Sequence, residues 1–247
     1  MDILYVLGKG SKWDNNELRY SLRSIEKFGK NVGKVYVVGY NPGFLSNEIT
    51  YIECKDKWSS IDSHKNILNC ICTAIEKSDI DDEFLYSSDD HYYTKETDFN
   101  NYPYYVKGIL PNEICGEINR MCYNRSLYDT RELLNKYDYT YYNFSQHGNT
   151  HFSRKAIELA KPLIEESYNI GFGCEPTCIV LNVLYKHKPF NYIERADVKV
   201  NKDIENIEGL KKVIKDREVF SIYDNAIDKG VSEYLQDLFP NKSKYEL

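Results

Sequence analysis

The chain has 247 residues and a formal net charge of -6. This length suits one large α/β domain, and the acidic balance excludes the strong basic field that draws proteins to nucleic acid or anionic lipid. We expect no membrane span and no signal peptide, because no apolar run is long enough and the N-terminus lacks a basic start with an apolar centre. Seven cysteines without a Cys-x-x-Cys pair indicate reduced thiols and a cytoplasmic location.

Apolar runs and amphipathic segments alternate through the first ninety residues. Buried strands are predicted at 2–7, 34–39 and 49–53, and a fourth strand begins at Glu83. Between them, the spacing of apolar residues predicts a helix that starts near Asp14 and another over 59–77. Such alternation favours a mostly parallel sheet with helices on both faces.

The fourth strand ends in Ser88, two acids and a histidine, namely Asp89, Asp90 and His91. Paired carboxylates at a strand end, followed by an imidazole, suit a divalent cation that carries phosphate oxygens. Ser-Asp-Asp is also common in ordinary turns. The sequence therefore leaves a cation site and a plain turn open at this point.

The first strand is followed by the loop Gly8-Lys9-Gly10-Ser11. The loop matches neither a Walker motif nor a dinucleotide fingerprint. Nucleotides nevertheless bind at the carboxyl ends of the strands in open α/β sheets. We therefore expect Gly8, Lys9 and Gly10 to lie against a nucleoside.

The first helix is predicted to begin with a capping box made by Asp14 and Glu17. Arg19 and Arg23 lie one turn apart on this helix. Two arginines near the glycine loop suit a diphosphate, which they would bind bidentately. The alternative is a pair of surface arginines bridging to Glu26 or Asp14.

The second helix carries His64 and Lys65 in its first turn. A helix start with a lysine and a histidine is a natural site for an anion, here the donor diphosphate or ribose. The alternative for His64 is capping or local packing.

Residues 92–150 are rich in tyrosine and asparagine and have little periodicity. Tyrosines offer flat faces and hydroxyls to sugar rings, so this part is predicted to bind an acceptor; packing of a loop-rich flank is the alternative. Near its end, His147 and His151 surround a glycine turn, and either histidine is a candidate to complete a metal shell begun by Asp90.

Ser153 is predicted to cap a helix that runs to about Ser167, and Pro176 to open another. Glu175 precedes that proline and follows a glycine loop, so it is a candidate base on an acceptor hydroxyl, or simply the helix cap. Beyond residue 191 the pattern predicts a strand over 218–223, a short helix over 231–239 and a polar tail over 240–246.

Residues 16–25, Asn-Glu-Leu-Arg-Tyr-Ser-Leu-Arg-Ser-Ile, resemble the corresponding helix of the Stealth family. Departures from the family pattern are Lys9 in place of an aspartate, Ser88 in place of an asparagine, and His91 after the acids. Four further segments resemble family motifs, the last of them weakly: Tyr5 to Ser11, Ser63-His64, Phe84 to Asp90 and His147 to His151.

Stealth proteins are sugar-phosphate transferases of capsule synthesis, related to GT-A-type glycosyltransferases that use nucleotide sugars. The resemblance implies a single GT-A-like, Rossmann-like domain over 1–247 with a C-terminal extension. Its parts would be a nucleotide-sugar-binding part over about 1–91, an acceptor part that completes the metal site over about 92–190, and the extension over about 191–247.

These observations together predict a metal-dependent glycosyltransferase that moves a sugar from a nucleotide-diphosphate sugar, such as a UDP-sugar, to an acceptor hydroxyl. Mn²⁺ or Mg²⁺ is expected at Asp89, Asp90 and His91, with His147 or His151 as a further ligand. Three alternatives stay open: a Stealth-like sugar-1-phosphate transferase of surface polysaccharide synthesis, a phage-type glycosyltransferase acting on modified DNA bases, and a non-catalytic sugar- or nucleotide-binding module. The expected acceptor is a carbohydrate or a modified nucleobase.

Overall fold

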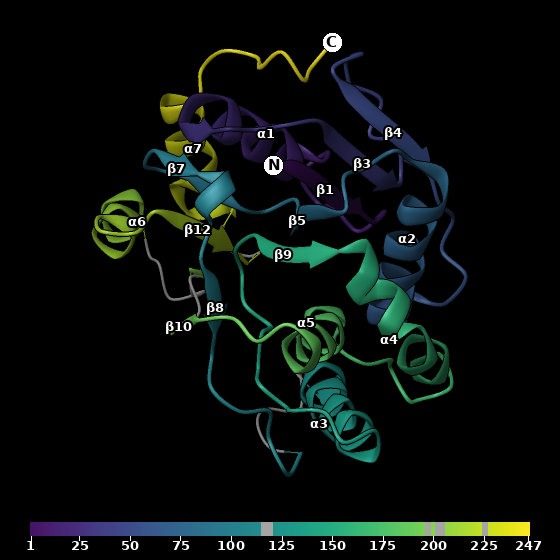
Figure 1. Cartoon of the computed structure of the whole chain (residues 1–247). Coiled ribbons are helices and arrows are strands. Elements are labelled where there is room, and N and C mark those ends of the chain that lie inside the picture. Colours follow the sequence, from purple (N-terminus) through teal and green to yellow (C-terminus); the bar gives the residue numbers. More distant parts are fainter. Residues whose placement is uncertain (115–120, 196–198, 201–205, 224–226) are drawn as a thin grey trace.

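The computed structural model describes residues 1–114, 121–195, 199–200, 206–223 and 227–247. At its centre is a five-stranded sheet with the order β4-β3-β1-β5-β9 (Figure 1). The first four strands are parallel, and β9 is antiparallel to β5. Their bounds are β1 Asp2–Leu7, β3 Val35–Gly39, β4 Ile49–Glu53, β5 Glu83–Ser87 and β9 Thr150–Ser153.

Helices cover both faces of this sheet, as predicted. One face, which includes Ile3 and Tyr5 of β1, packs on α1; the other, which includes Leu4, packs on α2, α4 and α5. This division follows from the alternation of side chains along each strand. The bounds of the helices around the sheet are α1 Asn16–Phe28, α2 Ser63–Lys77, α3 Met121–Lys136, α4 Arg154–Ser167 and α5 Pro176–His187.

Within the described residues, no helix is both long enough and apolar enough to cross a membrane.

Smaller elements surround the sheet. Three minor sheets pair β2 (Gly29–Lys30) with β7 (Thr97–Asp98), β8 (Tyr104–Val106) with β10 (Tyr192–Glu194), and β12 (Val219–Ile222) with both β6 (Tyr92–Tyr93) and β11 (Lys199–Val200). The other helical segments of the described residues are η1 Ser60–Asp62, η2 Phe99–Asn101, α6 Ile207–Ile214, the π-helical η5 Ile227–Val231 and α7 Ser232–Leu238.

The start of α1 differs from the predicted capping box. Asp14 and Asn15 both have left-handed backbone conformations, with φ of 52° and 56°. The hydroxyl of Ser11 accepts hydrogen bonds from the backbone N–H groups of Trp13 and Asn15, and donates to Glu17 Oε2 at 2.8 Å. The glycine loop and the helix start are therefore joined by Ser11, and Asp14 is not the cap.

The part over 92–150 contains more regular structure than its sequence indicated. Helix α3 was not predicted, because its tyrosines and asparagines obscure the helical spacing. The later helices were predicted well: Ser153 caps α4 by accepting a hydrogen bond from the N–H of Ala156, and Pro176 opens α5.

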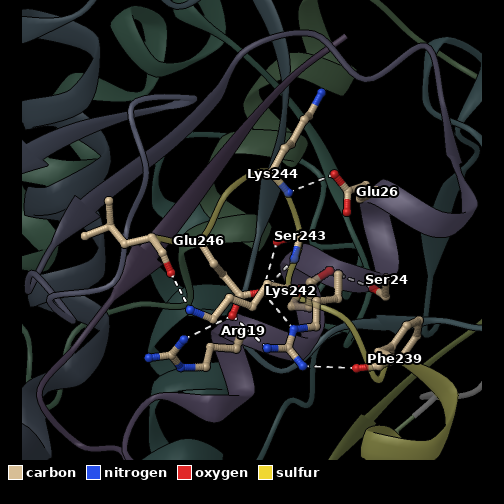
Figure 2. Close-up of polar contacts among 11 residues, drawn as sticks. Arg19, Ser24, Glu26, Phe239, Lys242, Ser243, Lys244 and Glu246 are labelled. Carbon is tan, nitrogen blue, oxygen red and sulfur yellow. Dashed lines mark hydrogen bonds and ion pairs between the residues drawn. The ribbon is translucent and has the colours of Figure 1, made fainter.

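The C-terminal segment was predicted as a polar tail, but it is bound to the body of the protein. The side chain of Glu246 is fully buried, and its carboxylate accepts two hydrogen bonds from Arg23 at 2.7 and 2.8 Å and one from Arg19 at 3.0 Å. The backbone N–H and the hydroxyl of Ser243 also donate to it, and Figure 2 shows this cluster between α1 and the chain end. Burial opposes the charge of Glu246, but these donors and the charge of Arg23 outweigh it and lower its pKa to about 2.

We expect Glu246→Gln to reduce the free energy of unfolding by about 2 kcal/mol at pH 7, because it leaves two guanidinium groups without a carboxylate. Since the pKa is lowered from 4.5 to about 2 in the folded state, this stabilisation is present above pH 4.5 and is lost as the pH falls towards 2. Denaturant unfolding at pH 7 and pH 3 measures the difference between the variant and the wild type, with the exposed Glu132→Gln as control. A deficit that does not shrink at the lower pH would contradict the assignment.

Candidate functional site

A chain of cavities follows the edge of the sheet where β1, β3 and β5 end. The acid cavity, of about 350 Å³, contains Asp89 and Asp90; it shares Gly8, Gly10, Ser88 and Asp89 with the glycine-loop cavity, of about 300 Å³. The strand-end cavity, of about 470 Å³, continues from there over the ends of β3 and β4. An aromatic cavity of about 420 Å³ adjoins the acid cavity. The predicted glycine loop and acid pair therefore meet at one edge of the sheet.

The acid pair is held at the end of β5 by the residues that flank it. His91 lies directly after the pair and is buried, and its carbonyl accepts a hydrogen bond of 2.8 Å from Ser21 of α1. The hydroxyl of Ser87 lies 3.2 Å from Nδ1 of the same histidine. These contacts fix the turn from both sides, and Asp89 and Asp90 line the acid cavity.

The two carboxylates have opposite electrostatic surroundings. Burial, and then the negative charge of Asp90, raise the pKa of Asp89 to about 7. Burial also acts on Asp90, but the nearby positive charge of Lys199 and a 2.6 Å hydrogen bond from Ser221 outweigh it, so its pKa lies below the usual value. The pair thus concentrates negative charge in a confined space, where a cation would relieve the repulsion.

His91 is the buried residue that directly follows the acid pair. Its Nε2 lies 4.0 Å from Asp90 Oδ1, and burial lowers its pKa to about 4. Among the described residues, no group of three or more His, Cys, Asp or Glu side chains is arranged to hold a metal ion. Two carboxylates alone still fit Mg²⁺ or Mn²⁺ when substrate phosphates supply further oxygens.

The register of β9 separates the two later histidines. Because β9 is antiparallel to β5, its first residue, Thr150, lies opposite Tyr86 near the end of β5. His147, three residues earlier, therefore reaches the acid cavity. His151 pairs with Leu85 farther along the strand, stacks on Tyr104 and binds the carbonyl of Tyr102.

Two site residues that the sequence analysis did not identify come from the small C-terminal sheet. Strand β12 pairs with β6, the short strand that follows Asp90 and His91 in the chain. This pairing brings the hydroxyl of Ser221 within hydrogen-bond distance of Asp90. Lys199 of β11 is paired with Ser221, and its ammonium lies 3.5 Å from Asp90 Oδ2. Neither has a local sequence signal, because both positions depend on pairing between segments more than one hundred residues from the acids.

The glycine loop lies where it was predicted. Gly8 and Gly10 line both the acid and the glycine-loop cavities, and Lys9 lines the glycine-loop and strand-end cavities. The buried Glu17, assigned by sequence to a capping box, also lines the acid cavity, and its charge contributes to the raised pKa of Asp89.

Arg19 and Arg23 lie away from these cavities. Both bind Glu246, and Arg23 also donates to the carbonyl of Phe239 at 3.0 Å. Arg23 binds Glu246 through two donors, whereas Arg19 gives it one hydrogen bond and its side chain is 28% exposed. Neither guanidinium lines the cavities at the strand ends, where a diphosphate was expected. The partner is neither of those considered from sequence, Glu26 or Asp14.

The two candidate residues in the first turn of α2, His64 and Lys65, have different surroundings in the structure. His64 lines the aromatic cavity, where burial lowers its pKa although the nearby Glu175 carboxylate opposes the shift. Lys65 is buried, and its ammonium lies 3.9 Å from Asp62. His64 therefore stays a candidate for ligand contact, whereas Lys65 has a partner within its own turn.

Glu175 occupies the N-cap of α5. Its Oε2 accepts hydrogen bonds from the Thr177 hydroxyl at 2.6 Å and from the N–H of Cys178 at 2.8 Å. The residue is buried and is not among the lining residues of the four cavities described above. The geometry thus supports the capping interpretation, and the predicted base has no direct contact with these cavities.

Comparison with known proteins leaves the family open. No protein-family model and no curated protein matches the chain. Among solved structures, one similar chain is a glycosyltransferase involved in the glycosylation of the major capsid of PBCV-1. The two are 16% identical, with a TM-score of 0.44 over 96% of this chain and 98% of that one. At this level the similarity does not decide a function.

The glycine loop before α5 packs against the start of α2, and a substitution at Gly173 tests this contact. Gly173 has φ of 85°, and an added Cβ would lie 2.7 Å from Cγ of Lys65 and 3.1 Å from its backbone N. We expect Gly173→Ala to lower the free energy of unfolding by about 1–2 kcal/mol, because alanine is strained at this φ and meets the start of α2. Thermal or denaturant unfolding measures the change.

Gly8→Ala is the matched control, since nothing lies within 4 Å of a Cβ added there. It should unfold within about 0.5 kcal/mol of the wild type. Equal losses in the two variants would show that contact with α2 does not account for the effect.

Proposed function

We propose that the protein is a metal-dependent glycosyltransferase that moves a sugar from a nucleotide-diphosphate sugar to an acceptor hydroxyl. The observation that supports this most is the placement of Asp89 and Asp90 in a cavity continuous with the glycine loop of β1. Open α/β sheets bind nucleotides at this edge, beyond the carboxyl ends of their strands. A carboxylate pair there is suited to the phosphates of such a donor.

Asp89 and Asp90 would hold Mg²⁺ or Mn²⁺ together with the donor's phosphate oxygens. Bound there, the cation would supply charge compensation for the departing diphosphate. His91 would position the pair through its contacts with Ser87 and Ser21. The nearby imidazole of His147 lines the same cavity and would be a further ligand.

The nucleoside would occupy the glycine-loop and strand-end cavities. Tyr40 and Tyr51 offer aromatic faces there, and Asp56 lines both cavities. Aromatic rings suit the flat surface of a base, and a carboxylate suits the hydroxyls of a ribose. Lys9, whose ammonium lies 6.0 Å from the centre of the Tyr40 ring, adds positive charge at this end.

The acceptor would bind in the aromatic cavity. Tyr123, Phe172 and Tyr223 line it together with hydroxyls of Ser60, Ser63 and Ser126. Such a mixture of flat apolar faces and hydrogen-bonding groups suits a sugar ring. The acceptor proposed for this cavity is a carbohydrate, and a modified nucleobase, which also has a flat face, stays the alternative.

A thermal-shift screen of nucleotide sugars, with and without Mn²⁺, tests the proposal. A ligand that binds the folded state raises the melting temperature, so the true donor should stand out and should need the cation. Analysis of the products then identifies the bond that breaks. A nucleoside diphosphate supports sugar transfer, a nucleoside monophosphate supports sugar-1-phosphate transfer, and binding without turnover supports a binding module.

Asp90→Asn should reduce transfer by about 10²-fold or more, because the amide keeps the shape but not the charge that holds the cation. Steady-state rates and calorimetric titration with Mn²⁺ plus nucleotide measure the two effects. The exposed Asp237→Asn serves as control and should leave both unchanged. Full activity of Asp90→Asn, or of the wild type in excess chelator, would refute the metal assignment.

Phe172→Ala should raise the KM for the acceptor about 10-fold and leave the KM for the donor unchanged, because a half-buried aromatic face is lost from one cavity alone. The control is Tyr137→Ala, which removes a partly exposed ring outside the four cavities. A rise in the donor KM instead would place the donor in the aromatic cavity.

A further inference from the structure

The acid cavity and the aromatic cavity meet at two residues. The lining of each includes His147 and Lys199, and these are the two described residues that line both. If the donor phosphates occupy one cavity and the acceptor the other, the reacting bond lies at this junction. Lys199 would then place a positive charge where the bond to the leaving group breaks.

Three contacts hold the ammonium of Lys199 in place. Its ammonium lies 3.5 Å from Asp90 Oδ2, 3.3 Å from His147 Nε2 and 4.6 Å from the centre of the Tyr223 ring. The side chain is 19% exposed. The pairing of β11 with β12 fixes its backbone beside Ser221, which itself binds Asp90. A long side chain held in this way loses little further freedom on binding a phosphate.

We propose that Lys199 is a catalytic residue that binds the donor's leaving phosphate and neutralises the charge that develops on it. This assignment rests on the proposed transfer from a nucleotide-diphosphate donor. A diphosphate carries more negative charge than the single carboxylate of Asp90, so it is the stronger partner for the ammonium once the donor is bound. Preorganised charge of this kind stabilises a transition state because it needs no rearrangement during the reaction.

The bond between the anomeric carbon and the β-phosphate oxygen breaks, and its electron pair stays on that oxygen. The acceptor oxygen forms the new bond to the anomeric carbon, and its proton passes to solvent water. Lys199 keeps its protons and donates a hydrogen bond to the phosphate oxygen, so no further reactant is required.

Inorganic pyrophosphate with Mg²⁺ is a direct probe of this role, because it does not depend on the identity of the base or sugar. Calorimetric titration should show that Lys199→Met binds pyrophosphate about 10- to 100-fold more weakly than the wild type. Lys199→Arg, which keeps the charge, should recover most of that loss. Lys161→Met removes an exposed lysine of α4 outside these cavities and should bind as the wild type does.

With the donor found by screening, Lys199→Met should lower kcat by about 10²-fold and leave the KM of the acceptor nearly unchanged. A merely structural pairing with Asp90 predicts lower thermal stability with unchanged pyrophosphate affinity. Wild-type affinity of Lys199→Met and Lys199→Arg for pyrophosphate would overturn the inference, while the proposed function would stand if the wild type still transferred sugar. If the wild type bound neither pyrophosphate nor any nucleotide sugar, both would fail.

Discussion

Two carboxylates in one confined cavity are the constraint on which the candidate site depends. Asp89 and Asp90 repel each other, and burial makes that repulsion expensive, so the surrounding residues must compensate for it. Ser221 and Lys199 do so for Asp90, while Ser21 and Ser87 fix the histidine that follows. A fold that brings three separate segments, α1, β11 and β12, to one negative pair is more readily explained by use of that charge than by a simple turn.

The sequence allowed prediction of the sheet because its strands carry their own signal. The apolar runs at β1, β3, β4 and β5 need no partner to be recognised, and their alternation with helices indicates parallel pairing. The acid pair and glycine loop followed from the same signal, since both lie at strand ends. Helix α3 was missed because its apolar spacing is interrupted by polar residues and tyrosines.

The rest of the site could not be predicted, because it depends on pairing between distant segments. His147 and His151 look equivalent in sequence, yet the antiparallel register of β9 puts one in the acid cavity and the other against Tyr104. Lys199 reaches Asp90 only through β12 and β6. A shift of one residue in any of these pairings would turn the side chains to the opposite face.

Positive side chains meet different partners at two places in the fold, a buried carboxylate beside α1 and the acid pair beside β11. Arg19 and Arg23 seemed suited to a diphosphate because they follow the glycine loop, but a buried carboxylate from the chain end takes both. The fork of Arg23 is matched by Glu246, which also accepts one hydrogen bond from Arg19. The ammonium of Lys199 instead faces a pair of acids whose charge it only partly offsets. A guanidinium already satisfied by a buried carboxylate has little to gain from a phosphate. The ammonium of Lys199 lies at the junction of two cavities, so under our proposal the phosphate-binding role expected of α1 falls to β11.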